Sequence, residues 1–242
     1  MEGEIRMGID IMGWMRYQYC RLRQYPHYQK ERKQAEARAN GASFAEFEAL
    51  RALRGTERGN RCFVIGDGTG LSAEEIRFLQ AEKTFGVGAF LEQDLFVPRY
   101  IGIQNPEQLK RLKNGILTAE NGTVFAGDNL AGQDGLPADA VLYSYLGVYQ
   151  YYLNRYGEHQ TKFSEDAYAV VYGGSHAAYS MMQIAAYLGF TEICLIGCGP
   201  ADDVRLTAAY RTAQAFAEAH GIRIFDCTAG ASGGVFPHRE LL

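Results

Sequence analysis

Residues 172–197 have the sequence YGGSHAAYSMMQIAAYLGFTEICLIG. This pattern predicts a glycine turn at 172–176, a helix over 175–188 and a buried strand over 192–196. A helix start presents backbone N–H groups that bind a phosphate or a carboxylate well. We therefore expect Gly173, Gly174 and Ser175 to donate hydrogen bonds to a phosphate group.

A second glycine-rich turn, Gly66-Asp67-Gly68-Thr69-Gly70, follows a predicted apolar strand at 62–65. It is not a P-loop and lacks the third glycine of a dinucleotide fingerprint, so a tight strand-to-helix turn is an equal interpretation. Asp67 would repel a phosphate but could bind a ribose hydroxyl, a base amine or a metal. Together the two turns indicate a nucleotide-type ligand held by an α/β sheet.

From residue 61 onward, predicted strands and helices alternate. Strands are predicted at 62–65, 84–87, 98–103, 123–125, 140–143, 192–196 and 222–226. Helices are predicted at 73–81, from 105, at 146–156, 175–188 and 202–220, with Ser72, Asn105 and the pair Asp202-Asp203 at helix starts. This order predicts an α/β, Rossmann-like fold with a mostly parallel sheet and helices on both faces. Ligands of such sheets bind beyond the carboxyl ends of the strands, which adds Gly197 to the candidate binding residues.

Residues 1–58 differ in pattern and are predicted to form a helical appendage to a Rossmann-like transferase domain at 59–242. Ser43 is the predicted N-cap of an amphipathic helix at 44–53. We expect the appendage to pack on the domain or on a second copy of the chain, and to leave a folded core when residues 1–54 are deleted. Its mixture of aromatic and basic residues is also compatible with a peripheral membrane contact.

The composition limits the classes of function. A chain of 242 residues with 47% apolar residues supports one α/β domain with an appendage, and the net charge of −4 argues against general nucleic-acid binding. Five cysteines in no regular pattern suit a reducing cytoplasm, where we place the protein. No apolar run is long enough to predict a transmembrane segment.

The candidate catalytic residues surround the first turn. His176 could supply positive charge or act as an acid or base near neutral pH, with Tyr172 beside it. The alternative is a helix capped by Ser175 with an exposed histidine. No general base is evident, and His159 and Asp226 are the two candidates.

The cysteines form no visible zinc set, and Cys194 is expected in the core. Cys198 and Cys227 follow neighbouring strands and could approach each other, although free thiols are the simpler interpretation. Asp202 and Asp203 are expected to begin a helix rather than bind a metal.

Several segments in order resemble a known family. They are 61–71, 84–87, 98–104, 172–174, 185–197 and 215–237. Over roughly residues 55–240 the chain resembles the bacterial branch of the 6-hydroxymethylpterin diphosphokinase-like family, which is related to flagellin-glycosylation motility factors. More distantly it is similar to sialyltransferases that use CMP-sialic acid.

The chain departs from this family at several polar positions. Asp67 replaces the asparagine of the family's Gly-Asn-Gly-Pro-Ser turn, and Gly88 stands where an asparagine is common. Gly197-Cys198-Gly199 replaces Gly-Val-Asp, and the longer lid that usually follows is missing. These changes suit a different substrate or a lost activity.

The resemblance implies a glycosyltransferase of surface-polysaccharide biosynthesis that uses a nucleotide-activated sugar, with a CMP-nonulosonate as the favoured donor, a glycan as the acceptor and no required cofactor. The phosphates would lie near residues 173–176, and the base and ribose near 66–70. One alternative is a pterin-type diphosphokinase using ATP and magnesium, with Asp67, Asp202 and Asp203 as candidate ligands. Another is a non-catalytic nucleotide-binding or assembly module.

Overall fold

A computed structural model describes residues 11–19, 22, 25–112, 116–117, 122–146, 162–174, 176–199, 202–228 and 231–242. Its centre is a seven-stranded sheet in the order β5-β4-β3-β2-β1-β8-β9, in which every pair of neighbours is parallel. The strands are β1 (Arg61–Ile65), β2 (Thr84–Gly86), β3 (Tyr100–Ile103), β4 (Thr123–Gly127), β5 (Val141–Tyr143), β8 (Glu192–Ile196) and β9 (Arg223–Asp226). The predicted α/β fold class is therefore confirmed.

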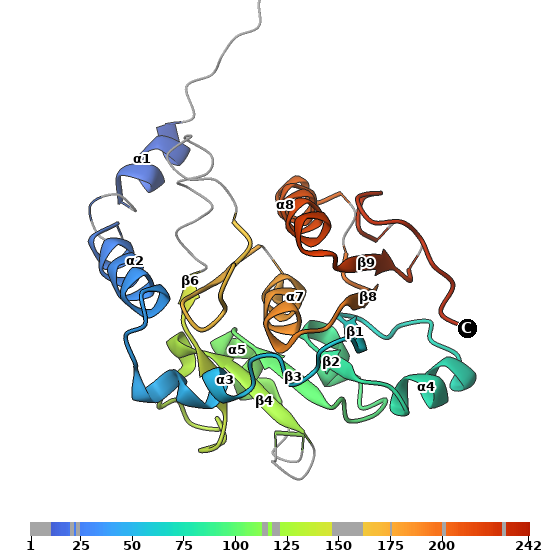
Figure 1. The fold of residues 1–242 in the computed structure, drawn as a ribbon. Helices are drawn as coiled ribbons and strands as arrows, with labels where there is room; N and C mark the ends of the chain where they lie inside the picture. Colours follow the sequence, from blue (N-terminus) through green and yellow to red (C-terminus); the bar gives the residue numbers. More distant parts are fainter. Residues whose placement is uncertain are drawn as a thin grey trace, which may run out of the picture.

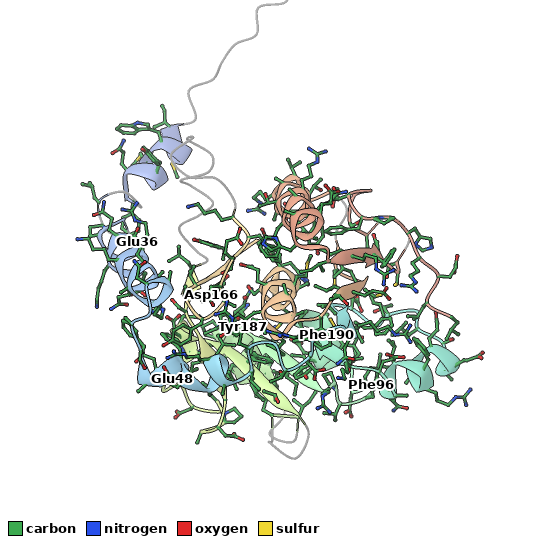
Figure 2. The ribbon with its side chains drawn as sticks, in the orientation of Figure 1. Glu36, Glu48, Phe96, Asp166, Tyr187 and Phe190 are labelled. Carbon is green, nitrogen blue, oxygen red and sulfur yellow. The ribbon has the colours of Figure 1, made fainter. Side chains whose placement is uncertain are left out.

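Helices cover both faces of the sheet (Figure 1). Alternation along β1 directs Cys62 and Val64 to one face and Phe63 and Ile65 to the other, where they join two separate apolar clusters. The helices α7 (Ala177–Leu188) and α8 (Val204–His220) contribute to the first cluster, and α4 (Ala73–Gln80) and α5 (Pro106–Arg111) to the second. Phe190, labelled in Figure 2, packs edge-on against Phe85 of β2, which ties the turn after α7 to the sheet.

The predicted helix starts are confirmed at three positions. The Ser72 hydroxyl accepts a hydrogen bond from the N–H of Glu75, and the Glu75 carboxylate accepts one from the N–H of Ser72 at 2.7 Å, which forms a capping box at α4. Asn105 caps α5 and Asp203 caps α8. Each cap satisfies backbone N–H groups that a helix start leaves without a partner.

Two local predictions were wrong. Leu146 does not begin a helix, because β6 (Tyr145–Leu146) pairs with β7 (Val171–Tyr172) in a small second sheet; residues 147–156 of that predicted helix lie outside the described residues. Ser43 is not an N-cap. Its hydroxyl donates to the Glu48 carboxylate at 2.6 Å, while a 3-10 turn, η2 (Ala45–Phe47), precedes the short helix α3 (Glu48–Ala52).

The N-terminal part contains α1 (Ile11–Tyr19) and α2 (Tyr25–Ala39), of which α2 lies beside β6 in Figure 1. Ala35 of α2 packs with Leu146 and Val170. Phe47 is buried and Leu50 belongs to the main core, so this part of the predicted appendage packs within the domain. Across the described segments, every helix is too short or too polar to cross a bilayer.

Candidate functional site

The order in which strands are added to the sheet reverses between β1 and β8, and a crevice lies at this point. From β1 the strands proceed outward to β5, and the chain then returns to the other side of β1 at β8. The loops after β1 and β8 leave in opposite directions, and such points are the usual ligand sites of open α/β sheets. A cavity of about 370 Å³, which we call the switch-point crevice, opens at these strand ends. Its lining includes Asp67, Thr69, Gly70, Glu75, Gly197 and Thr228.

Gly66 and Gly197 allow the two loops to approach closely. A Cβ atom on Gly66 would lie 2.7 Å from the carbonyl oxygen of Gly197. Gly197 has a φ of +59°, a conformation that favours glycine, and its N–H donates to the Thr228 hydroxyl at 2.9 Å. The glycines at these two strand ends are therefore explained by close backbone packing within the protein.

The other residues of the first turn divide into packed and open positions. Gly68 is packed, because a Cβ atom there would lie 2.6 Å from the Leu95 side chain. Gly70 has a φ of +90°, and a Cβ atom on it would meet no other atom within 4 Å, so it borders open space in the crevice. Thr69 also lines the crevice.

Asp67 organises its own turn. One carboxylate oxygen, Oδ1, accepts hydrogen bonds from the N–H of Thr69 at 2.8 Å, from the Thr69 hydroxyl at 2.6 Å and from the Gln93 amide at 2.5 Å. These bonds, led by that from the Thr69 hydroxyl, lower the pKa of Asp67. Gln93 also accepts from the N–H of Gly68 at 3.0 Å. Asp67 is thus an ionised group of the loop, and it faces the crevice together with the Glu75 carboxylate.

His176 lies over the ends of β1 and β2. A Cβ atom on Gly66 would be 2.9 Å from its Cε1 atom, and one on Gly88 would be 3.6 Å from its Nε2 atom. Its Nδ1 atom accepts a hydrogen bond from the N–H of Ala178 at 3.1 Å, so His176, rather than Ser175, is the N-cap of α7. This bond assigns the ring hydrogen to Nε2. Burial lowers the pKa of His176, which favours a neutral ring with one N–H donor over a positive charge.

Gly173 and Gly174 are held by the small sheet and by α7. The N–H of Gly173 donates to the Leu146 carbonyl oxygen at 3.0 Å, and a Cβ atom on Gly174 would overlap the ring of Tyr179. The backbone of Tyr172 is bonded on both sides by the side chain of Gln183. The N–H of Gly173 therefore makes a hydrogen bond within the protein, in place of the predicted bond to a phosphate. Ser175 lies outside the described residues.

Of the two candidate bases, Asp226 is engaged within its own loop. The carboxylate of Asp226 accepts hydrogen bonds from the N–H of Thr228 at 3.0 Å and of Ser232 at 2.7 Å, and its side chain is buried. Asp226 therefore shapes the loop after β9. His159 lies outside the described residues, and Asp203 is engaged as the cap of α8.

Polar side chains far apart in the sequence complete the site. Gln93 and Thr228 bond to the loops after β1 and β8, and the amide of Gln108 donates to the Gly88 carbonyl oxygen at 2.6 Å. No local motif marks these three residues, because their partners are 20 or more positions away. Within the described segments no group of three or more His, Cys, Asp or Glu residues is placed to hold a metal ion.

A second polar cluster lies at the end of β4. The Asp128 carboxylate accepts a hydrogen bond from the N–H of Tyr145 at 3.0 Å, and burial raises the pKa of Asp128 to about 6. Arg38 of α2 is buried, with its Nε atom donating to the Ala169 carbonyl oxygen at 2.9 Å and its guanidinium over the Phe47 ring. Its Nη2 atom finds no hydrogen-bond partner among the described residues. Arg38 thus anchors α2 to the domain.

Comparison with known proteins gives no assignment: the chain matches no protein-family model and no curated protein.

Proposed function

We propose that the switch-point crevice binds the nucleotide of an activated sugar and that the protein is a glycosyltransferase of surface-polysaccharide biosynthesis. The favoured donor is a CMP-nonulosonate, and the acceptor is a glycan. The position of the crevice between β1 and β8 carries this proposal, because that position is where open α/β sheets bind nucleotides. Its volume of about 370 Å³ lies in the range of about 300–1,000 Å³ typical of small-molecule sites.

The charges of the crevice favour the sugar and base end of a nucleotide. Asp67 and Glu75 both line it, and each has one carboxylate oxygen engaged by the loop. Carboxylates accept hydrogen bonds from ribose hydroxyls and base amines and repel phosphate. We therefore assign the ribose and base to the side of the crevice formed by residues 67–75.

The phosphate would extend toward His176. Its neutral ring offers an Nε2–H donor beside Gly66 and Gly88, at the start of α7 where the helix dipole favours negative charge. In transfer of a sugar, a donor at this place would stabilise the charge that develops on the leaving phosphate. Tyr172 remains a candidate at this edge, since its backbone is fixed by Gln183.

A magnesium-dependent diphosphokinase is the second candidate. The observation in its favour is that two carboxylates, Asp67 and Glu75, line one crevice. Oxygen ligands of this kind hold the magnesium that accompanies ATP in phosphoryl transfer. The Asp67→Asn variant separates the two candidates, because it removes a charge needed by a cation while keeping the Oδ1 acceptor of the loop.

A thermal-shift series of the full chain tests the proposal with CMP, CDP, UDP, GDP and ATP, each with and without magnesium. A ligand present at about 100 times its Kd stabilises the folded state by about 2.7 kcal/mol, or about 5–10 °C for a chain of this size. We expect this shift with CMP independently of magnesium in the wild type, and a smaller shift, also independent of magnesium, in Asp67→Asn, which loses the second carboxylate oxygen available to the ribose and base. A magnesium-dependent shift with ATP that Asp67→Asn abolishes would support the diphosphokinase instead.

The His176→Asn variant tests the phosphate end. Asparagine keeps a capping oxygen for the N–H of Ala178 but removes the Nε2–H donor, so we expect about tenfold weaker CMP binding with little loss of stability. His220→Asn is the matched control, because His220 is an exposed histidine at the end of α8 and does not line the crevice. Equal CMP affinities in the two variants would remove His176 from the site. Absence of binding by every nucleotide would contradict both enzymatic candidates and favour the non-catalytic assembly module.

A further inference from the structure

Two free thiols lie on the same face of the sheet, one in β8 and the other directly after the neighbouring strand β9. Cys194 of β8 is directly opposite Phe225 of β9, and Cys227 follows two positions later. Side chains alternate along a strand, so Cys227 faces the same side as Phe225. Both cysteines belong to the apolar cluster that also contains Ile196.

A second hollow gives solvent access to this pair. It has a volume of about 320 Å³, and its lining includes both thiols and the side chains of Arg61 and Arg239. We call it the dithiol hollow. Cys194 is buried, whereas Cys227 is half-buried and also lines the switch-point crevice. Cys227 therefore forms part of the wall between the two cavities.

The two thiols differ in how readily they lose a proton. The neighbouring Cys227 thiol, together with burial, raises the pKa of Cys194, whereas the neighbouring Cys194 thiol lowers the pKa of Cys227. The positive charge of Arg239 adds to the lowering at Cys227, while burial and Asp226 oppose it. A thiolate is the reactive form of cysteine, and Cys227 is also the more exposed of the two, so Cys227 is the better nucleophile of the pair.

We propose that Cys194 and Cys227 form a peroxide-reactive dithiol, a modification site in the wall of the switch-point crevice that closes to an intramolecular disulfide. In the first step the Cys227 thiolate attacks one oxygen of hydrogen peroxide. An S–O bond forms and the O–O bond breaks, which oxidises the sulfur to a sulfenic acid and releases hydroxide that is protonated to water.

In the second step the sulfur of Cys194 attacks the sulfenic sulfur of Cys227. The S–S bond forms, the S–O bond breaks, and the leaving oxygen takes the proton that Cys194 gives up and departs as water. Cellular thiols restore the pair by exchange, so the modification is reversible in a reducing compartment.

Closure of the disulfide would disturb the crevice. The two cysteines are diagonal neighbours rather than directly opposite, offset by two residues along the strands, so residue 227 must move toward Cys194 when the disulfide forms. The next residue, Thr228, accepts the hydrogen bond from the N–H of Gly197. Oxidation is therefore expected to shift the end of β8 at the crevice. The reaction of the two thiols is measured without any nucleotide, so its test does not depend on the proposed function.

Mass spectrometry of the full chain in a Cys20→Ser background tests the pair. With N-ethylmaleimide at neutral pH, we expect Cys227 to be labelled at least about tenfold faster than Cys62 and Cys198, which are buried and whose pKa values are raised by burial. Equimolar hydrogen peroxide should then produce one disulfide joining residues 194 and 227, which dithiothreitol reverses.

Two variants isolate the roles. Cys194→Ala should stop the reaction at a sulfenic acid on Cys227 that a dione reagent traps, and Cys227→Ser should lose both products. Cys198→Ser is the matched control and should form the disulfide as the wild type does. Labelling of Cys227 no faster than of Cys62, a disulfide between other cysteines, or overoxidation of Cys227 without a disulfide would each overturn the proposal. The relative labelling rates of the cysteines in the chain without these substitutions test the proposal even if a variant fails to fold.

Discussion

We expect Gln183 to contribute more than any other single polar side chain to the stability of the segment 172–174, which precedes α7. It is 1% exposed within α7. Its Oε1 atom accepts from the N–H groups of Ser164 at 3.1 Å and Tyr172 at 2.9 Å. Its Nε2 atom donates to the carbonyl oxygens of Tyr172 at 2.7 Å and Tyr179 at 3.0 Å. The side chain thus uses all of its hydrogen-bonding capacity to join three segments.

The magnitude follows from the groups that Gln183→Met would leave behind. Methionine has a similar length but cannot bond, so the N–H of Ser164 and the two backbone groups of Tyr172 lose the hydrogen bonds that Gln183 makes to them. Each unsatisfied buried group costs about 1–3 kcal/mol, and partial exposure to water keeps the sum near the lower end, at about 3–6 kcal/mol. For a chain of this size the lower figure corresponds to a fall in Tm of about 6–12 °C.

Urea unfolding followed by circular dichroism measures this loss. Gln214→Met is the matched control, because Gln214 is a half-exposed glutamine of α8 and the substitution changes the same chemical groups. We expect the control to stay within about 0.5 kcal/mol of the wild type. A Gln183→Met variant as stable as the Gln214→Met control would refute the argument that the hydrogen bonds of Gln183 stabilise this part of the fold.

Two further predictions concern ionisation and the N-terminal part. The folded pKa of Asp128, about 6, lies above its unfolded value, so the folded state binds the proton more tightly and wild-type stability falls as pH rises through that interval. Asp128→Asn keeps an acceptor for the N–H of Tyr145, so it should match the wild type near pH 4 and exceed it at pH 7.5 in urea unfolding; equal stability at both pH values would contradict the shift. Deletion of residues 1–54 removes Phe47 and Leu50 from the core, each worth about 1.5–3 kcal/mol, so its thermal melt should lose cooperativity, whereas deletion of 1–24 should keep it. A cooperative melt after the longer deletion would restore the simpler division of the chain at residue 58.

The sheet could be predicted because each strand carries its own signal. Buried parallel strands such as β1 and β8 are short apolar runs, and the residues that begin α4, α5 and α8 are strong N-caps. The β6–β7 pairing gave no such signal. Two-residue strands have too little sequence to show a period, and their pairing depends on contacts between segments about 26 positions apart.

The candidate site was only partly predictable for the same reason. The turn after β1 and Gly197 meet in one crevice, as their positions at strand ends suggested. The sequence could not indicate that the N–H of Gly173 is used by Leu146, or that Gln93 and Thr228 hold the two loops, because these are pairings between distant residues. Local patterns predict where a turn lies, whereas tertiary contacts decide which of its N–H groups stay available to a ligand.

The central claim is that a nucleotide binds at the junction of β1 and β8. Hydrogen-exchange mass spectrometry of the full chain, with and without saturating CMP, tests it most directly. We predict slower exchange in peptides covering 66–75 and 196–199, where the crevice is lined, and unchanged exchange in α2 and at the end of α8. Protection confined to peptides away from residues 66–75 and 196–199, with CMP bound, would contradict the account.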